Sequence, residues 1–267
     1  MANMEVHYKN YFNTTTLCDP NTGTDTVANL IDRNKTTQYS SSGKNDDTAG
    51  VTIAVEFLSS RNINRICLQN INLKGFKIYY SSNSANTIDN LTSTCETSTS
   101  QWSENSSTSM YLIFPTTAMT SVFIVATTTM IANQEKKIGQ IWCDQTYLKF
   151  ENNPSYKNYK VTPGDAKEHT HEMVGGGWTN YRLGKYFKAD IKMQYQSASM
   201  TSDFNDLHDE KSSFVFVPYP TGSSWFNYDY EGIFECNWIG NFDFAPSQDN
   251  FVQTGYNGKI KLRETPR

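Results

Sequence analysis

Apolar and polar residues alternate along the stretch 51–57, VTIAVEF, so that Val51, Ile53 and Val55 fall on one face. A polar break, SSRN, follows, and then come two further runs rich in Ile, Leu, Phe and Tyr, INRICLQN and GFKIYYSS. Alternation with a period of two, bounded by Ser, Asn and Gly, is typical of antiparallel strands with one buried face. The pattern therefore predicts a β-sheet protein.

The strand pattern predicts a first domain over residues 21–150. Its expected strands are 51–57, 63–70, 75–82, 109–114, 121–128 and 138–144. The Ser/Thr/Asn-rich stretch 81–109 indicates a long surface connection, with Trp102 as the anchor that holds it to the sheet. Residues 1–20 are polar and irregular, and they predict an N-terminal arm.

A second domain is predicted over residues 151–267. The segment Asn152–Pro154 marks the boundary, because proline restricts the residue before it and ends strand pairing. The runs that follow are rich in aromatic residues and predict more strands. One helix is expected over 201–211, capped by Thr201 or Ser202. The predicted fold class is thus all-β, with two tandem β-sandwiches.

Composition narrows the function classes. The 267-residue chain has a net charge of -4, whereas a nucleic-acid surface needs a basic stripe. Its apolar runs are far shorter than the roughly 20 residues of a membrane helix, and no secretory signal opens it. The five cysteines are scattered, without a CxxC pair, which favours reduced, buried thiols. We therefore expect no cofactor, no disulfide, no nucleic-acid partner and no membrane contact.

Four segments in order, NLIDRNKTTQYSSS, VTIAVEF, INRICLQNINLKGFKIYYSS and KKIGQIWCD, resemble the discoidin-like (coagulation-factor-type C, galactose-binding-like) jelly roll. The resemblance covers residues 26–148. It implies that Asp32 and Thr36 or Thr37 lock the turn before the first long strand, with Tyr39 where the family usually has Trp. Asp and Thr side chains suit this role because they bond nearby backbone amides. The family commonly binds carbohydrates or surfaces.

The second half is similar to a different family, the distal-tail and baseplate-hub proteins of bacteriophages, which have a galectin-like β-sandwich. The motifs that carry this similarity are Gly176-Gly177-Trp178, the run 186–191 (YFKADI), the run 214–218 (FVFVP), Trp238-Ile239-Gly240 and the run 255–260 (GYNGKI). The resemblance implies a structural role in the phage tail.

Candidate metal ligands fall in two places. His169 and His171 would share one face of a strand, a geometry that zinc can use, although a solvated loop is the alternative. Asp32, Asp46 and Asp47 could surround a structural cation, or they could be solvated turn carboxylates. Because no catalytic motif is complete in the chain, we expect no enzyme activity.

The leading hypothesis is a structural component of a phage virion, in the tail or baseplate, made in the host cytoplasm. Its partners would be other virion proteins and copies of itself. The alternative is a carbohydrate- or receptor-binding module that uses the jelly-roll loops to bind a host surface glycan. The aromatic stretch 225–244 could be a sugar platform, but it is expected to form core and assembly interface. The interface candidates are Trp225, Phe226, Tyr228, Tyr230 and Phe234.

Overall fold

The structure is a computed structural model that describes most of the chain. The described residues are 3–18, 27–34, 37–41, 46–48, 50–82, 100–144, 147–163, 168–172, 178–182, 187–218, 232–247 and 255–265. Contacts divide the chain into two compact units. We call Lys9–Tyr147 with Asn227–Ile233 the sandwich unit, and Met1–Tyr8, Leu148–Phe226 and Phe234–Arg267 the second unit.

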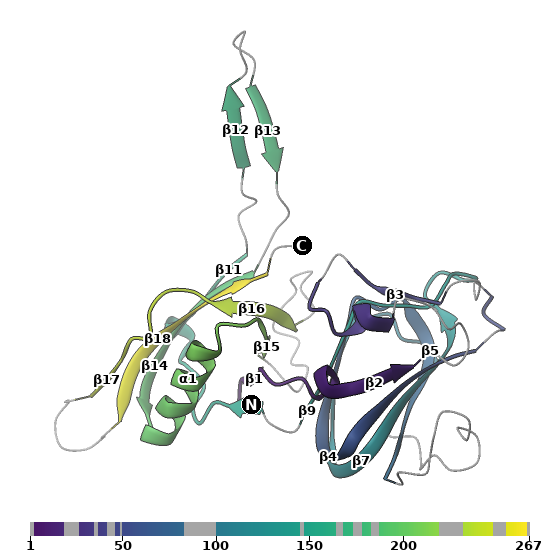
Figure 1. Ribbon diagram of the computed structural model, residues 1–267. Helices are drawn as coiled ribbons and strands as arrows, with labels where there is room; N and C mark the ends of the chain where they lie inside the picture. Colours follow the sequence, from purple (N-terminus) through teal and green to yellow (C-terminus); the bar gives the residue numbers. More distant parts are fainter. Residues whose placement is uncertain are drawn as a thin grey trace. The chain divides into compact units, whose positions relative to one another are not determined.

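The described strands of the sandwich unit pair with one another in antiparallel fashion (Figure 1). Its elements are η1 (Tyr11–Thr14), β2 (Thr15–Cys18), η2 (Val27–Leu30), β3 (Tyr39–Ser40), β4 (Val51–Gln69), β5 (Leu73–Ser81), β6 (Ser100–Trp102), β7 (Ser109–Thr129), β8 (Lys137–Ile138) and β9 (Gln140–Asp144). The strand order in the main sheet is β2-β4-β7-β5-β6, with β9 also paired to β4, while β3 pairs with β8. The prediction of an all-β sandwich is confirmed here.

Two long strands, β4 and β7, run through the whole sandwich unit. The pairing between them shifts register between Glu56 and Arg61 and again between Ile63 and Arg65. Residues before and after the first shift, such as Val55 and Ile66, are buried in one common core. The polar break at 59–62 is therefore an irregularity within one strand, where the sequence pattern predicted two separate strands.

The second unit is built on one eight-stranded sheet. Its elements are β1 (Glu5–His7), β10 (Tyr147–Lys149), η4 (Tyr156–Asn158), β11 (Tyr159–Pro163), β12 (Glu168–Glu172), β13 (Trp178–Arg182), β14 (Phe187–Gln196), α1 (Ala198–Glu210), β15 (Phe214–Val217), β16 (Phe234–Trp238), β17 (Phe244–Pro246) and β18 (Tyr256–Glu264). The sheet order is β10-β1-β15-β16-β18-β14-β11, with β17 paired to β18. β12 and β13 form a separate two-stranded sheet. All described strands of the second unit except β12 and β13 thus belong to one sheet, in agreement with the predicted all-β fold.

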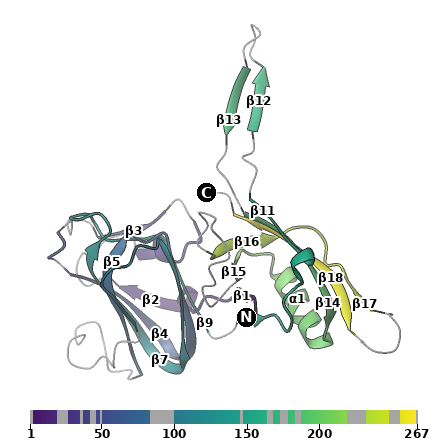
Figure 2. The same cartoon turned by 180° about the vertical axis from the view of Figure 1, so that it is seen from behind.

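Helix α1 lies against this sheet, as the view from behind in Figure 2 shows. It begins three residues before the expected start, because the hydroxyl of Ser197 accepts a hydrogen bond from the backbone N of Met200 at 3.0 Å. Its buried Phe204 contacts Phe150 edge-to-face and stacks on Phe244, with ring centroids 5.1 and 5.3 Å away. Burial of these rings fixes the helix on the sheet.

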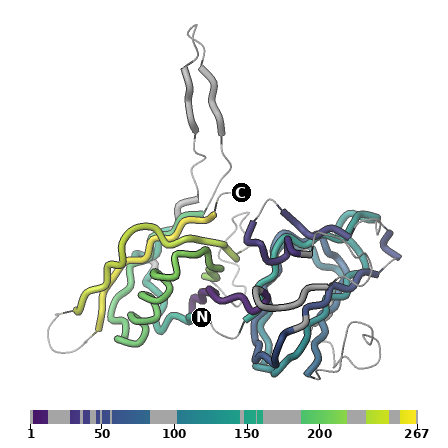
Figure 3. Tube along the Cα trace, viewed as in Figure 1, coloured from purple at the N-terminus to yellow at the C-terminus, as the bar shows by residue number. Residues whose placement is uncertain are grey.

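The N-terminal segment does not form a separate arm. β1 pairs with β15 and, in Figure 3, its trace joins the strands of the second unit. Met4 and Val6 are buried in the structure, with 2% and 1% exposure. β2 belongs instead to the sandwich unit, where it pairs with β4. The sandwich unit is therefore inserted after the first strand of the second unit, and the predicted domain of residues 151–267 leaves this strand out.

Candidate functional site

Asp32 closes the turn that precedes the first long strand. Its Oδ2 accepts a hydrogen bond from the hydroxyl of Thr37 at 2.5 Å, and its Oδ1 accepts one from the backbone N of Asn34 at 2.8 Å. Oδ1 also accepts from Nε2 of Gln140 at 2.7 Å. The Asp32 carboxylate therefore stabilises the turn by bonds within it and also connects the turn to Gln140 of β9. Tyr39, the third turn residue that the resemblance implied, is fully buried in the core.

Gln140 is the centre of this turn, a role that the sequence pattern did not reveal. The residue is 2% exposed, and its Nε2 donates to the carbonyl oxygen of Asn29 at 3.1 Å as well as to Asp32. Its Oε1 accepts from the backbone N of Arg33 at 3.2 Å. Because both ends of the amide are bonded within the chain, this cluster stabilises the fold and offers no site for a ligand.

The three carboxylates suggested for a cation do not converge. Asp47 accepts hydrogen bonds from the backbone N and hydroxyl of Thr129 and from the backbone N of Asn133, at 3.0–3.2 Å. Asp46 accepts from Thr48, while Asp32 is bound in the turn described above. Within the described residues, no group of three or more His, Cys, Asp or Glu is placed to hold a metal.

A lysine supplies the positive charge beside Asp46 and Asp47. Lys136 is 1% exposed, and its Nζ donates to the carbonyl oxygen of Asp46 at 2.6 Å. Hydrogen bonds from the backbone and hydroxyl of Thr48 lower the pKa of Asp46, and the charge of Lys136 adds to this effect. Desolvation raises the pKa of Asp47, but the bonds from Asn133 and Thr129 outweigh it, so that its pKa lies below its usual value.

These lowered pKa values predict acid sensitivity of the sandwich unit. A carboxylate whose pKa is lower in the folded state stabilises the fold above its unfolded pKa of about 3.9, and this contribution disappears as the pH falls through the folded pKa. We expect Asp47→Asn to lower the melting temperature at pH 7 and to flatten its fall below about pH 4. Calorimetry over pH 2.5–7 measures this. The exposed substitution Asp206→Asn is the control, and an equal effect of both would contradict the account.

A hollow of about 380 Å³ opens on the sandwich unit beside β5, β6 and β7. It is lined by Gly75, Phe76, Lys77, Tyr79, Trp102, Ser103, Val125, Thr127 and Thr128. Two of these lining residues, Tyr79 and Trp102, are aromatic and partly exposed. The lining also contains the ammonium group of Lys77 and the hydroxyl groups of Ser103, Thr127 and Thr128. No carboxylate is among these lining residues.

The hollow is held in shape by packing and hydrogen bonds around Trp102. The indole ring stacks on buried Phe76, with centroids 4.4 Å apart and planes inclined by 20°. Asn105, just after β6, donates from Nδ2 to the carbonyl oxygen of Leu73 at 2.7 Å and from its backbone N to that of Lys74 at 3.0 Å. These contacts confirm Trp102 as the anchor of this connection and position it before any ligand arrives.

The histidine pair lies on the separate sheet of β12 and β13. His169 is opposite Tyr181, and His171 is opposite Thr179. His208 lies on α1, where its Nε2 is 3.1 Å from the carbonyl oxygen of Gly240 and its ring contacts Trp238 edge-on. The structure therefore gives His208 other partners, and a metal at His169 and His171 remains only a sequence-based prediction.

The aromatic interface candidates have different outcomes. Trp225, Phe226, Tyr228 and Tyr230 lie outside the described residues. Phe234 is 6% exposed and stacks on Phe187 with ring centroids 3.8 Å apart. Because this ring is part of the core of the second unit, Phe234 is not available as an assembly surface.

No protein-family model and no curated protein matches the chain. Among solved structures, the chitosan-binding module 1 of a chitosanase/glucanase from Paenibacillus sp. IK-5 is similar, with 14% identity, a TM-score of 0.44 and coverage of 52% of this chain and 100% of that module. The module CpGH89CBM32-5 from Clostridium perfringens, in complex with GalNAc-β-1,3-galactose, has 15% identity, a TM-score of 0.42 and coverage of 51% and 98%.

A third similar structure is the family 32 carbohydrate-binding module of NanJ from C. perfringens, in complex with galactose. It has 15% identity, a TM-score of 0.40 and coverage of 54% of this chain and 98% of that module. These similar structures are carbohydrate-binding modules, and none of the three is a phage tail or baseplate protein. At such identities and TM-scores they do not assign this chain to a family, so its function has to be argued from its own residues.

Proposed function

We propose that the sandwich unit is a non-catalytic carbohydrate-binding module and that the hollow beside Trp102 is its sugar site. The observation that carries this proposal is the combination, in one open hollow, of partly exposed aromatic rings with an ammonium and hydroxyl groups. Sugars present apolar C–H faces and polar hydroxyl edges. Trp and Tyr side chains, which have an apolar body and a polar end, suit such surfaces.

The lining residues favour binding over cleavage. Glycoside hydrolysis generally needs two carboxyl groups placed across the scissile bond. The lining contains Lys77, Thr127 and Thr128 as polar side chains near the aromatic rings, but no Asp or Glu. These groups can orient a sugar by hydrogen bonds. The lining residues do not include the pair of carboxyl groups that would act as acid and base in hydrolysis. This site lies beside the strands β5–β7, whereas the resemblance to the jelly-roll family predicted a ligand in the loops.

Substitutions in the hollow test this function. We expect Lys77→Ala and Trp102→Ala to weaken glycan binding by the full chain at least tenfold, since about 1.4 kcal/mol of lost contact already gives a factor of ten. The probes are galactose, GalNAc-β-1,3-galactose and chitotriose, followed by the strongest ligand from a glycan array, and titration calorimetry is the measurement. Lys77 is the more informative position, because its side chain is only half-buried and its loss leaves the core intact.

The matched control is Lys74→Ala. Lys74 lies on the same strand and forms an exposed ion pair with Glu104 at 2.9 Å, but it does not line the hollow. Its removal should change the affinity less than twofold. Equal losses for Lys74→Ala and Lys77→Ala, or binding by neither the wild type nor any variant, would exclude the hollow as a sugar site.

A structural role in a phage tail or baseplate is a second candidate, favoured by one observation. β12 and β13 pair only with each other among the described strands, through five residues each. A two-stranded sheet is marginally stable alone in water, so that a neighbouring molecule would stabilise it in an assembly.

Light scattering of the full chain and of a variant lacking residues 168–182 tests this candidate. An oligomeric full chain and a monomeric deletion variant would support it, whereas a full chain and a variant that are both monomeric would reject it.

A further inference from the structure

The second unit contains a polar pocket where β14 ends. Its volume is about 350 Å³, within the range of small-molecule sites. One wall is the end of β14, and the opposite wall is the segment that leads into η4. The lining residues are Asn152, Asn153, Pro154, Ser155, Asn158, Lys192, Met193, Gln194, Tyr195 and Gln196. Five of these ten side chains are amides, and none is a carboxylate.

An irregularity in β14 shapes the first wall. The pairing of β14 with β18 shifts register between Met193 and Gln196, and Tyr195 has a φ of +54°. Such bulges redirect side chains and are frequent next to functional sites. Gly255 makes room for the bulge, since a Cβ there would lie 2.8 Å from the backbone of Tyr195. The backbone N of Tyr195 donates to Oδ1 of Asn257 at 2.9 Å, which fixes the bulge further.

The second wall is held by its own hydrogen bonds. The backbone N of Met4 donates to Oδ1 of Asn153 at 2.9 Å, and Glu151 accepts from the hydroxyl and backbone N of Ser197 at 2.6 and 3.1 Å. Nδ2 of Asn158 reaches across to Oε1 of Gln194 at 3.4 Å. Both walls are therefore positioned by the fold itself.

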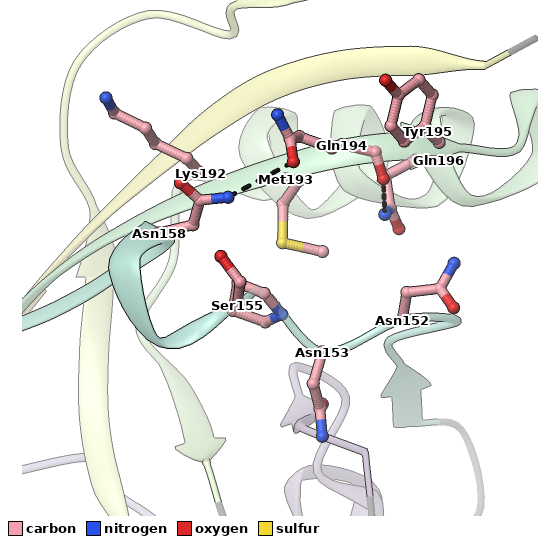
Figure 4. Close-up of a pocket in the computed structure, with 10 residues that line it drawn as sticks. Asn152, Asn153, Ser155, Asn158, Lys192, Met193, Gln194, Tyr195 and Gln196 are labelled. Carbon is pink, nitrogen blue, oxygen red and sulfur yellow. Dashed lines mark hydrogen bonds between the residues drawn. The ribbon is translucent and has the colours of Figure 1, made fainter. Parts of the chain in front are cut away.

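Gln196 has an unused acceptor at this pocket. Its side chain is buried, at 1% exposure, and Nε2 donates to the carbonyl oxygen of Gln194 at 2.8 Å. That bond fixes which end of the amide is the donor, and Oε1 has no hydrogen-bond partner among the described residues. An unpaired buried acceptor costs free energy that a ligand N–H can recover. Figure 4 shows Gln196 and Met193 turned from β14 toward the opposite wall, whereas Tyr195 is turned away.

Three kinds of groups thus meet in a small space. Gln196 provides an acceptor, the exposed amide of Asn152 provides a donor, and the thioether of Met193 provides an apolar surface. A secondary acetamide has the complementary groups: an N–H donor, a C=O acceptor and a methyl group. We propose that this pocket binds the acetamido group of an N-acetylated amino sugar, with its N–H on Gln196 and its methyl group on Met193.

Binding of N-acetylglucosamine by the full chain tests this proposal. The Trp102→Ala variant is used throughout, so that the hollow of the sandwich unit does not contribute. We expect N-acetylglucosamine to bind at least tenfold more tightly than glucose or glucosamine, and its acetyl methyl protons to receive the strongest saturation transfer in NMR. Gln196→Met, which keeps the side-chain volume, and Asn152→Ala at the exposed wall should each weaken binding at least tenfold.

Lys160→Ala is the matched control, because Lys160 is an exposed residue of β11 that does not line the pocket. It should change the affinity less than twofold. If Gln196→Met does not fold, Asn152→Ala decides the question. Three outcomes would overturn the proposal: glucose binds as tightly as N-acetylglucosamine, N-acetylglucosamine does not bind at concentrations up to 20-fold above the millimolar range expected of a single sugar, or Asn152→Ala leaves the affinity unchanged. Binding of N-acetyl-lysine methylamide without binding of the sugar would overturn it in favour of an acetylated peptide.

Discussion

Deleting residues 1–8 is expected to unfold the second unit and to leave the sandwich unit folded. β1 lies between β10 and β15, and all four residues of β15 are buried. Loss of the buried Met4 and Val6 side chains alone removes about 3–6 kcal/mol, at roughly 1.5–3 kcal/mol each. The hydrogen bonds between β1 and β15 are lost in addition. This is comparable with the whole stability of a typical domain, about 5–15 kcal/mol.

Differential scanning calorimetry of the full chain and of the deletion variant measures this effect. The deletion should remove one transition and leave the other at its original temperature. Lys149→Ala, at an exposed position on neighbouring β10, is the control and should leave both transitions in place. A deletion variant that keeps both transitions would show that residues 1–8 are a dispensable arm, as the sequence alone suggested.

Gln140→Ala is expected to destabilise the sandwich unit by about 2–4 kcal/mol. The substitution removes three hydrogen bonds from Nε2 and one to Oε1, with distances of 2.7–3.4 Å. Each such bond contributes about 0.5–1.5 kcal/mol net, and the buried groups left behind add to the loss. Urea unfolding at pH 7 measures the free energy. The exposed Gln134→Ala should change it by less than about 0.5 kcal/mol.

Gln140→Glu keeps the size of the side chain and replaces its amide by a carboxyl group, so that it tests the role of the amide alone. The substitution places a second carboxylate where Nε2 now lies 2.7 Å from Oδ1 of Asp32. Like charges at this distance repel, so that the variant should be unstable at pH 7 and should recover stability as the pH falls and the new carboxyl group is protonated. A stability as high as that of the wild type at pH 7 would contradict the assigned orientation of the amide.

Alternation of apolar residues correctly predicted the sheet content of the sandwich unit, because burial on one face of a strand imposes a period of two. It did not show that residues 51–69 form one strand. The exposed Leu58 and its polar neighbours look like a turn in the sequence, whereas the register shift after Glu56 absorbs them without ending the pairing. Such irregularities depend on the partner strand, which a single sequence does not reveal.

The N-terminal strand and the two pockets were missed for a similar reason. Glu5–His7 is too short and too polar to have a recognisable pattern, and its burial depends on pairing with β15, more than 200 residues away. Trp102 was correctly identified as an anchor by its isolation in a polar stretch. The residues that join it around the hollow, such as Lys77 and Thr127, come from separate strands, and only the fold brings them together.

Hydrogen–deuterium exchange of the full chain, with and without its strongest glycan ligand, tests the central claim most directly. Sugar bound in the hollow should slow exchange of amides in β5, β6 and the end of β7, the strands that line it. Amides of β12, β13 and α1 should exchange at unchanged rates in the Asn152→Ala background, where the pocket of the second unit is impaired. Protection confined to the second unit, or no protection at a saturating glycan concentration, would contradict the assignment of the sandwich unit as a carbohydrate-binding module.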